Sequence, residues 1–205
     1  GVVFFCPLLA WGLLALPGRL RQVAVPAWLA LHLLLLGHTL ATWQHVGHTL
    51  HHLLRSLPVA QASPQQPLYV LHIPSLYKGM YGLAWGFQGG LQWYHGPQAS
   101  EQVVPVAFQY AWEEAPHATV RPDSAHTIRV RTGPQRAILR YQHAALITEE
   151  TPRYAITLDE AVPNHAYRLR FKTPPPHRFV VWDEGVWDYY SLDSTGVQHQ
   201  RLAQD

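Results

Sequence analysis

The first 100 residues contain no acidic residue, and this feature constrains the fold more than any other. The charged residues in this half are all basic: Arg19, Arg21, Arg55 and Lys78. All 13 acidic residues, beginning with Glu101, lie in the remainder of the chain. Soluble domains typically carry about 25% charged residues of both signs. We therefore predict an apolar, membrane-associated front half joined to a soluble back half.

Two apolar stretches in the front half are candidate transmembrane helices. Residues 1–16 are apolar throughout and slightly shorter than the roughly 20 residues that cross a bilayer. A buried core helix or a signal-peptide core is the alternative for this stretch. The second stretch runs from Ala24 to Trp43 and has no charged residue. Because the chain begins with the apolar run Gly-Val-Val-Phe-Phe and no methionine, we expect it to be the C-terminal part of a longer protein.

The loop between these two stretches predicts their orientation in the membrane. It contains Arg19 and Arg21, and short loops rich in Lys and Arg remain on the cytoplasmic side. The chain that follows the second helix should then emerge outside the cytoplasm.

A histidine-rich segment follows the second apolar stretch and has the periodicity of an amphipathic helix. His38, His45, His48 and His52 share its polar face. The opposite face consists of Trp43, Val46, Leu50, Leu53, Leu54 and Leu57. We predict a helix that lies in the membrane interface with its leucines toward the lipid.

The same histidines also suggest an alternative, a metal site. His48, His51 and His52 form a His-x-x-His-His pattern, a spacing used by membrane di-iron desaturases and hydroxylases. In this alternative His45, His48 and His52 would be metal ligands. A di-iron centre needs further histidines from separate helices and carboxylate support, whereas the later histidines of this chain are scattered singly. We therefore expect no metal and no cofactor.

Residues 58–67, rich in proline and glutamine, predict a linker between domains. The chain then divides into membrane helices and an interfacial helix over 1–57, the linker, and an extracytoplasmic β-rich domain over 68–205. Beyond the linker, short apolar runs alternate with turn signals. Several of these runs alternate apolar and charged residues with period two, as residues 166–172 do, which is typical of a strand with one buried face.

The predicted fold class is α+β. Two N-terminal transmembrane helices and an amphipathic helix precede a mostly antiparallel, β-sandwich-like domain. The net charge is only +2 and no run of Lys or Arg occurs, so we expect no nucleic-acid partner. Phosphate-binding loops, nucleophile elbows and zinc motifs are absent from the sequence.

Residues 182–190, with the sequence Trp-Asp-Glu-Gly-Val-Trp-Asp-Tyr-Tyr, are a candidate binding site. Aromatic rings beside carboxylates often line carbohydrate sites, which makes Trp182, Asp183 and Trp187 candidate substrate-binding residues. The same letters also predict a β-hairpin with Asp183, Glu184 and Gly185 at its tip.

The segment from residue 68 to residue 91 has a buried strand that ends in proline, then a Tyr-Lys-Gly-Met-Tyr turn and a glycine-rich helix. With the histidine-rich helix before it, residues 24–95 resemble the tail of bacterial membrane glycosyltransferases of the dolichyl-phosphate-mannose mannosyltransferase type. This resemblance implies a bacterial inner-membrane enzyme that uses a lipid-linked sugar, with Tyr77, Lys78 and Tyr81 as further candidate substrate contacts.

The catalytic motif of those enzymes belongs to an early loop, so the resemblance assigns no catalytic residue to this chain. The expected partners are the lipid bilayer and the lipid-linked sugar, and this part of the protein would be an accessory domain. The alternatives are a non-enzymatic membrane-tethered binding or assembly domain, and a membrane di-iron oxidase.

Overall fold

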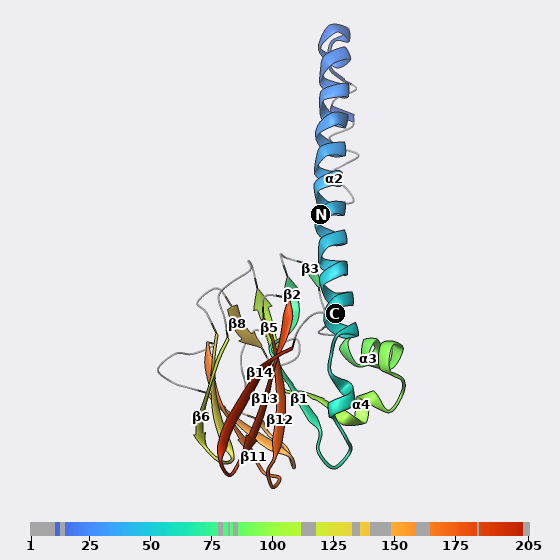
Figure 1. Ribbon diagram of the computed structural model, residues 1–205. Coiled ribbons are helices and arrows are strands. Elements are labelled where there is room, and N and C mark those ends of the chain that lie inside the picture. The colour runs from blue at the N-terminus through green and yellow to red at the C-terminus, as the bar shows by residue number, and fades with distance from the viewer. Residues whose placement is uncertain are drawn as a thin grey trace. The chain divides into compact units, whose positions relative to one another are not determined.

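The computed structural model (Figure 1) describes residues 11–12, 15–77, 80–81, 83, 86–111, 118–132, 136–139, 149–158, 165–183 and 185–202. The contacts within the chain divide it into two compact units, Gly1–His45 and Val46–Asp205. The division falls inside a helix and not at the proline-rich segment 58–67. That segment, predicted as a linker, belongs to the second unit.

Helix α2 spans Gly18–Arg55 without interruption. The second transmembrane helix and the interfacial helix that we predicted as separate elements are therefore one helix. It is the one helix among the described residues that is long and apolar enough to cross a membrane. Most of the first predicted helix, residues 1–16, lies outside the described residues.

The part of α2 in the first unit exposes large apolar side chains on all sides. These include Leu29, Leu31, Leu33, Leu34, Leu35, Leu36, Leu40 and Trp43. A helix that is apolar all round needs an apolar environment, either a protein core or a membrane. Among the described residues, none of the apolar window of this segment is buried, so no protein core covers it.

The second unit contains three sheets and short helices. Its elements are η1 (Val59–Gln61), β1 (Leu68–Leu71), β2 (Ile73–Tyr77), β3 (Met80–Tyr81), α3 (Phe87–His95), α4 (Ala99–Gln102), β4 (Val103–Pro105), β5 (Phe108–Ala111), β6 (Thr119–Ser124), β7 (Thr127–Arg131), β8 (Arg136–Leu139), β9 (Glu149–Glu150), β10 (Tyr154–Leu158), β11 (Ala166–Phe171), β12 (His177–Asp183), β13 (Val186–Asp193) and β14 (Gly196–Arg201).

Sheet A has the strand order β14-β13-β12-β1-β4, sheet C the order β6-β7-β11-β10-β9, and sheet B the order β3-β2-β5-β8. Most pairs are antiparallel, as predicted. Strand β1, however, pairs in parallel with both β12 and β4, and β2 pairs in parallel with β5. These parallel pairs are absent from a purely antiparallel arrangement and were not predicted.

The central strands of sheet A are buried on both faces. In β1, Leu68 and Val70 belong to one core cluster, whereas Tyr69 and Leu71 belong to another. Strand β12 alternates in the same way. The first cluster joins this sheet to α3, α4 and the end of α2, and the second joins it to sheet C. The unbroken apolar run of β1 follows from this burial on two sides.

The last turns of α2 are part of the first core cluster. Val46, Leu53 and Leu54 are buried in this unit, and Leu57 and Val59 continue the same cluster. From Val46 onward, the face that we predicted to lie on lipid is therefore covered by protein, which corrects that prediction, whereas Trp43 of the same face is exposed. Amphipathic periodicity shows only that one face has an apolar neighbour, and here the neighbour is sheet A with α3.

The chain passes from sheet A to sheet B at two neighbouring points. His72 separates β1 from β2, is fully buried, and has a φ angle of 59°. The second crossing, between β4 and β5, lies beside it, because the Ile73 N–H donates to the Ala107 carbonyl at 2.9 Å. The left-handed backbone at His72 is uncommon for a residue with a side chain and marks the place where the strand changes sheets.

Candidate functional site

The tryptophans predicted as substrate contacts lie opposite each other in a β-hairpin. Strands β12 and β13 pair Trp182 with Trp187 and Asp183 with Val186. The two indole rings are 5.0 Å apart at an interplanar angle of 66°. Gly185 in the turn has a φ angle of 84°, a conformation that glycine adopts without strain. The predicted hairpin is confirmed.

Both tryptophans are core residues under the end of α2. Trp187 is 2% exposed and its indole N–H donates to the Leu53 carbonyl at 3.2 Å. Trp182 is buried and lies edge-on to the His52 ring at 5.5 Å. Asp183 is also buried. In this conformation none of the three offers an open face to a sugar, because a stacking platform must be accessible to the ligand.

The other predicted contacts lie on a different sheet. Tyr77 ends β2 and Tyr81 ends β3, and these strands pair with Leu76 opposite Tyr81 and Tyr77 opposite Met80. Lys78 lies outside the described residues. The backbone therefore places Tyr77 and Tyr81 on neighbouring strands of sheet B but not opposite each other, whereas Trp182 and Trp187 belong to sheet A.

The histidines near the end of α2 bind partners within the second unit. His51 Nδ1 and the Tyr94 hydroxyl share a hydrogen bond of 2.5 Å, and His52 meets Trp182. His95 of α3 donates to the Leu54 carbonyl at 2.7 Å. His48 is exposed on the same helix. These contacts attach α3 to α2 and occupy two of the histidines in the His-x-x-His-His pattern.

No group of three or more His, Cys, Asp or Glu side chains that could hold a metal ion occurs among the described residues. His45 and His48 lie on α2, one at the end of the first unit and one near the start of the second.

A pair of histidines that the sequence did not single out lies at one edge of the second core cluster. His177 Nε2 and His126 Nδ1 are 3.4 Å apart, and the His177 ring stacks on Phe171 at 4.2 Å. Burial, with a smaller contribution from the neighbouring His126, lowers the pKa of His177 to about 4. The side chain is therefore neutral at physiological pH. Separation in sequence hid this pair, because the two positions are 51 residues apart.

A second aromatic group lies on β13 and β14. Tyr190 stacks on Phe179 at 5.1 Å and on His199 at 4.6 Å. His199 Nε2 lies 3.0 Å from the Asp188 carboxylate. Burial, together with the negative charge of Asp188, raises the pKa of Tyr190 to about 12. The tyrosine therefore remains a neutral hydroxyl group and a poor general base.

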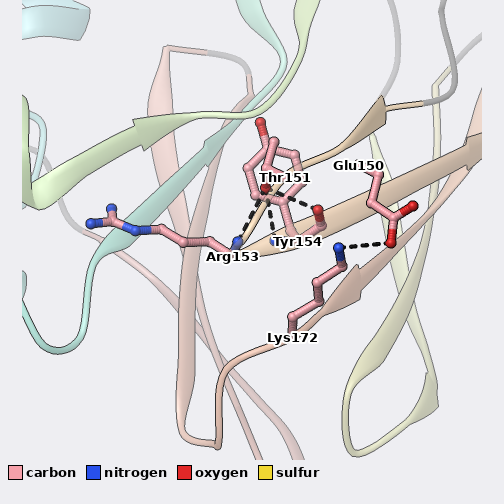
Figure 2. A network of polar contacts seen from close by, with 5 residues as sticks. All are labelled: Glu150, Thr151, Arg153, Tyr154 and Lys172. Atoms are coloured by element: carbon pink, nitrogen blue, oxygen red, sulfur yellow. Dashed lines mark hydrogen bonds and ion pairs between the residues drawn. The ribbon is translucent and has the colours of Figure 1, made fainter.

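A polar network at one end of sheet C is a structural turn (Figure 2). Thr151 Oγ1 accepts hydrogen bonds from the N–H groups of Arg153 at 3.3 Å and Tyr154 at 2.9 Å. The Thr151 hydroxyl and N–H both donate to the Tyr154 carbonyl. These hydrogen bonds satisfy backbone N–H and C=O groups between β9 and β10. The role of the threonine hydroxyl is therefore structural.

Comparison of the chain with protein-family models, with curated proteins and with solved structures finds no match. The resemblance to membrane glycosyltransferases therefore stays a prediction.

Proposed function

We propose that the chain holds a folded β-rich domain at a membrane, and that this domain binds or assembles with other molecules and is not itself catalytic. The observation that carries the proposal is α2. Its first part exposes apolar side chains in a length sufficient to cross a bilayer, and its last turns belong to the core of the domain. One helix thus belongs to both the anchor and the fold.

The condition of the predicted site residues supports a non-catalytic role. The best aromatic and acidic candidates, Trp182, Asp183 and Trp187, are buried core residues. His51, His52 and His95 contact a hydroxyl, a ring and a carbonyl within the fold, which gives these three a structural role. An enzyme would need its reactive groups to converge on an accessible position.

We retain the membrane glycosyltransferase as the proposed parent of this domain. In that form of the proposal the chain is an accessory extracytoplasmic part of a bacterial inner-membrane enzyme, and the lipid-linked sugar binds elsewhere in the protein. The sandwich-like architecture and a second membrane helix before Gly18 are part of the same proposal. Removal of residues 46–205 from such a parent should reduce acceptor transfer while the upstream catalytic motif remains intact.

Replacement of two central leucines tests the anchor. Leu34→Arg with Leu35→Arg places two charges in the apolar part of α2, where each costs about 2.5–3.5 kcal/mol in membrane insertion. In a chain that begins at residue 17, and so lacks the proposed earlier membrane helix, alkaline carbonate should then release the protein from membranes. The matched control is His45→Arg with His48→Arg, which adds the same charge beyond the apolar part and should leave the protein membrane-bound. Equal extraction of the unsubstituted chain and the leucine variant would refute the membrane anchor.

Reporter fusions test the orientation separately. The Arg19 and Arg21 loop should remain cytoplasmic, so a reporter after Asp205 should be active only outside the cytoplasm. Activity of that reporter inside the cytoplasm would reverse the proposed orientation and leave the anchor itself intact.

A further inference from the structure

The outer face of sheet C is strongly basic. Strands β7 and β11 alternate buried apolar residues with exposed charged ones. We define the basic face as the six side chains on this surface: Arg121, Arg129, Arg131, Arg168, Arg170 and Lys172. The inner face of the same strands belongs to the second core cluster. The basic face is thus fixed in place by the packing of the residues between its members.

Like charges lie directly opposite one another across this face. Arg121 of β6 is opposite Arg129 of β7, and Arg129 is in turn opposite Arg168 of β11. Neighbouring strands are about 4.8 Å apart, and like charges in directly opposite positions destabilise a sheet. Folding alone therefore gives no reason to place these arginines in one row.

Carboxylates offset only part of the charge. Asp123 Oδ2 lies 3.3 Å from Arg168 Nε and 3.8 Å from Arg129 Nε. Glu150 pairs with Lys172 at 2.8 Å, as Figure 2 shows. Within the described part of the chain, no ion pair is found for Arg121, Arg131 or Arg170. The face keeps a clear positive excess.

The composition of the face indicates the chemistry of its partner. Five of its six cations are arginines, whose planar guanidinium groups bind phosphate oxygens in pairs. The large exposed apolar side chains of the described residues lie on α2 and its N-terminal flank or at Trp93 on α3, and none lies on sheet C. The face therefore lacks the apolar centre of a protein–protein interface and the aromatic platform that stacks single-stranded bases.

The position of the basic face within the second unit favours a partner that binds from solution. The last turns of α2, with α3 and α4, pack on one side of sheet A, and sheet C packs on the other. Within this unit the basic face thus lies on the outer side of sheet C, with sheet A between it and the last turns of α2.

We propose that the basic face of sheet C is a docking surface for a soluble linear polymer that bears phosphate groups and no nucleobases. Binding neutralises the row Arg121, Arg129 and Arg168 and releases counterions from the polymer. In the free domain the like charges of this row repel one another, and binding of the partner removes that repulsion. This inference does not depend on the membrane anchor.

Anisotropy of fluorescently labelled inorganic polyphosphate tests the proposal. The full chain in a neutral detergent is titrated at 50 and 200 mM salt. With about four phosphate contacts, each contributing about 0.7 to the salt slope, affinity should fall about 50-fold across this range. The variant Arg121→Gln with Arg131→Gln should bind more weakly at both salts and lose only about 7-fold across the range.

The control removes the same charge elsewhere. Arg21 and Arg55 are exposed on α2 outside the basic face, and Arg21→Gln with Arg55→Gln should leave affinity and salt slope unchanged. The melting temperature of each variant confirms folding, and it should not fall for the basic-face variant because repulsion with Arg129 is relieved. An equal loss in both variants would overturn the proposal.

Two comparison ligands distinguish the proposed partner from other classes of partner. Vesicles of phosphatidylglycerol that bind the basic-face arginines while polyphosphate does not would identify lipid headgroups and overturn the proposal. Single-stranded DNA that binds more tightly than polyphosphate of equal charge, with the same variants sensitive, would point to nucleic acid and also overturn it. Polyphosphate binding that depends on the basic face and exceeds both ligands supports it.

Discussion

Trp187 shows how an individual residue can suggest a ligand site while serving the core. It is 2% exposed, packs against Trp182 and donates to the Leu53 carbonyl. We expect Trp187→Ala to lower the free energy of unfolding by about 3–5 kcal/mol, because a large buried ring is replaced by a cavity. Trp187→Phe should cost less, since most of the packing remains. Chemical denaturation measures both. Full stability of Trp187→Ala together with loss of ligand binding would restore the carbohydrate interpretation.

His177 should make stability depend on pH. Burial lowers its pKa to about 4 in the folded chain, from an ordinary value of 6.5. As pH falls through 6.5, His177 binds a proton in the unfolded chain, whereas in the folded chain it binds one only near pH 4. The free energy of unfolding should therefore decrease between these values, by at most about 3 kcal/mol.

Denaturation of His177→Gln across the same range measures this contribution. The variant lacks the titrating group, so its stability should vary less with pH than that of the parent, whatever its absolute stability. The same variant leaves the other 13 of the 14 histidines in place. Identical pH profiles would show that the proton uptake belongs to other residues.

At the scale of elements, the approach of α3 to α2 depends on Gly90. A Cβ atom at this position would lie 2.6 Å from the Leu54 Cδ1 methyl group, whereas a Cβ at neighbouring Gly89 meets nothing within 4 Å. Alanine is a better helix former than glycine by about 1 kcal/mol. We expect Gly89→Ala to stabilise the domain by up to that amount and Gly90→Ala to destabilise it.

Thermal melts of these two single variants provide a matched comparison. Both carry the same chemical change in the same helix, so the difference between them isolates the contact with Leu54. Equal stabilisation by both substitutions would show that the leucine side chain moves aside without cost and that α3 does not need glycine at residue 90.

Several elements could be predicted from the sequence, and others could not. The alternating run at 166–172 predicts β11, and the apolar run at 68–73 predicts β1, because a strand's side chains alternate with period two or are buried on both faces. The prediction of two separate helices was wrong because a continuous helix has no sequence signal at its middle. The parallel pairing of β1 with β12 and β4 joins residues far apart in the chain, which local patterns do not encode.

For the whole molecule, core packing sets the boundary between the apolar part of α2 and the β-rich domain. Leu53, Leu54, Leu57 and Val59 lie in the same cluster as the apolar face of sheet A. A chain that starts at residue 67 loses all four, each worth about 1.5–3 kcal/mol when fully buried. We expect residues 46–205 to be soluble and to melt cooperatively, and residues 67–205 to be much less stable or to aggregate.

Circular dichroism and size-exclusion chromatography of the two truncations measure this difference. Both lack the apolar part of α2, so any contrast reports on the last turns of that helix and on η1. A stable, monomeric 67–205 domain would restore the predicted linker as the domain boundary.

The sequence by itself determined the apolar helix, the β-rich back half, the hairpin at residues 183–185 and the alternation that points arginines outward from β7 and β11. These features follow from local composition and periodicity, which act over a few residues. Only the tertiary structure decided what each apolar face contacts. It placed Leu53 and Leu54 of α2 and both tryptophans in one core. It also joined His126 to His177 and aligned Arg121, Arg129 and Arg168 in a single row. The physical reason is that periodicity shows which side of an element avoids water, whereas packing between distant segments decides what covers it.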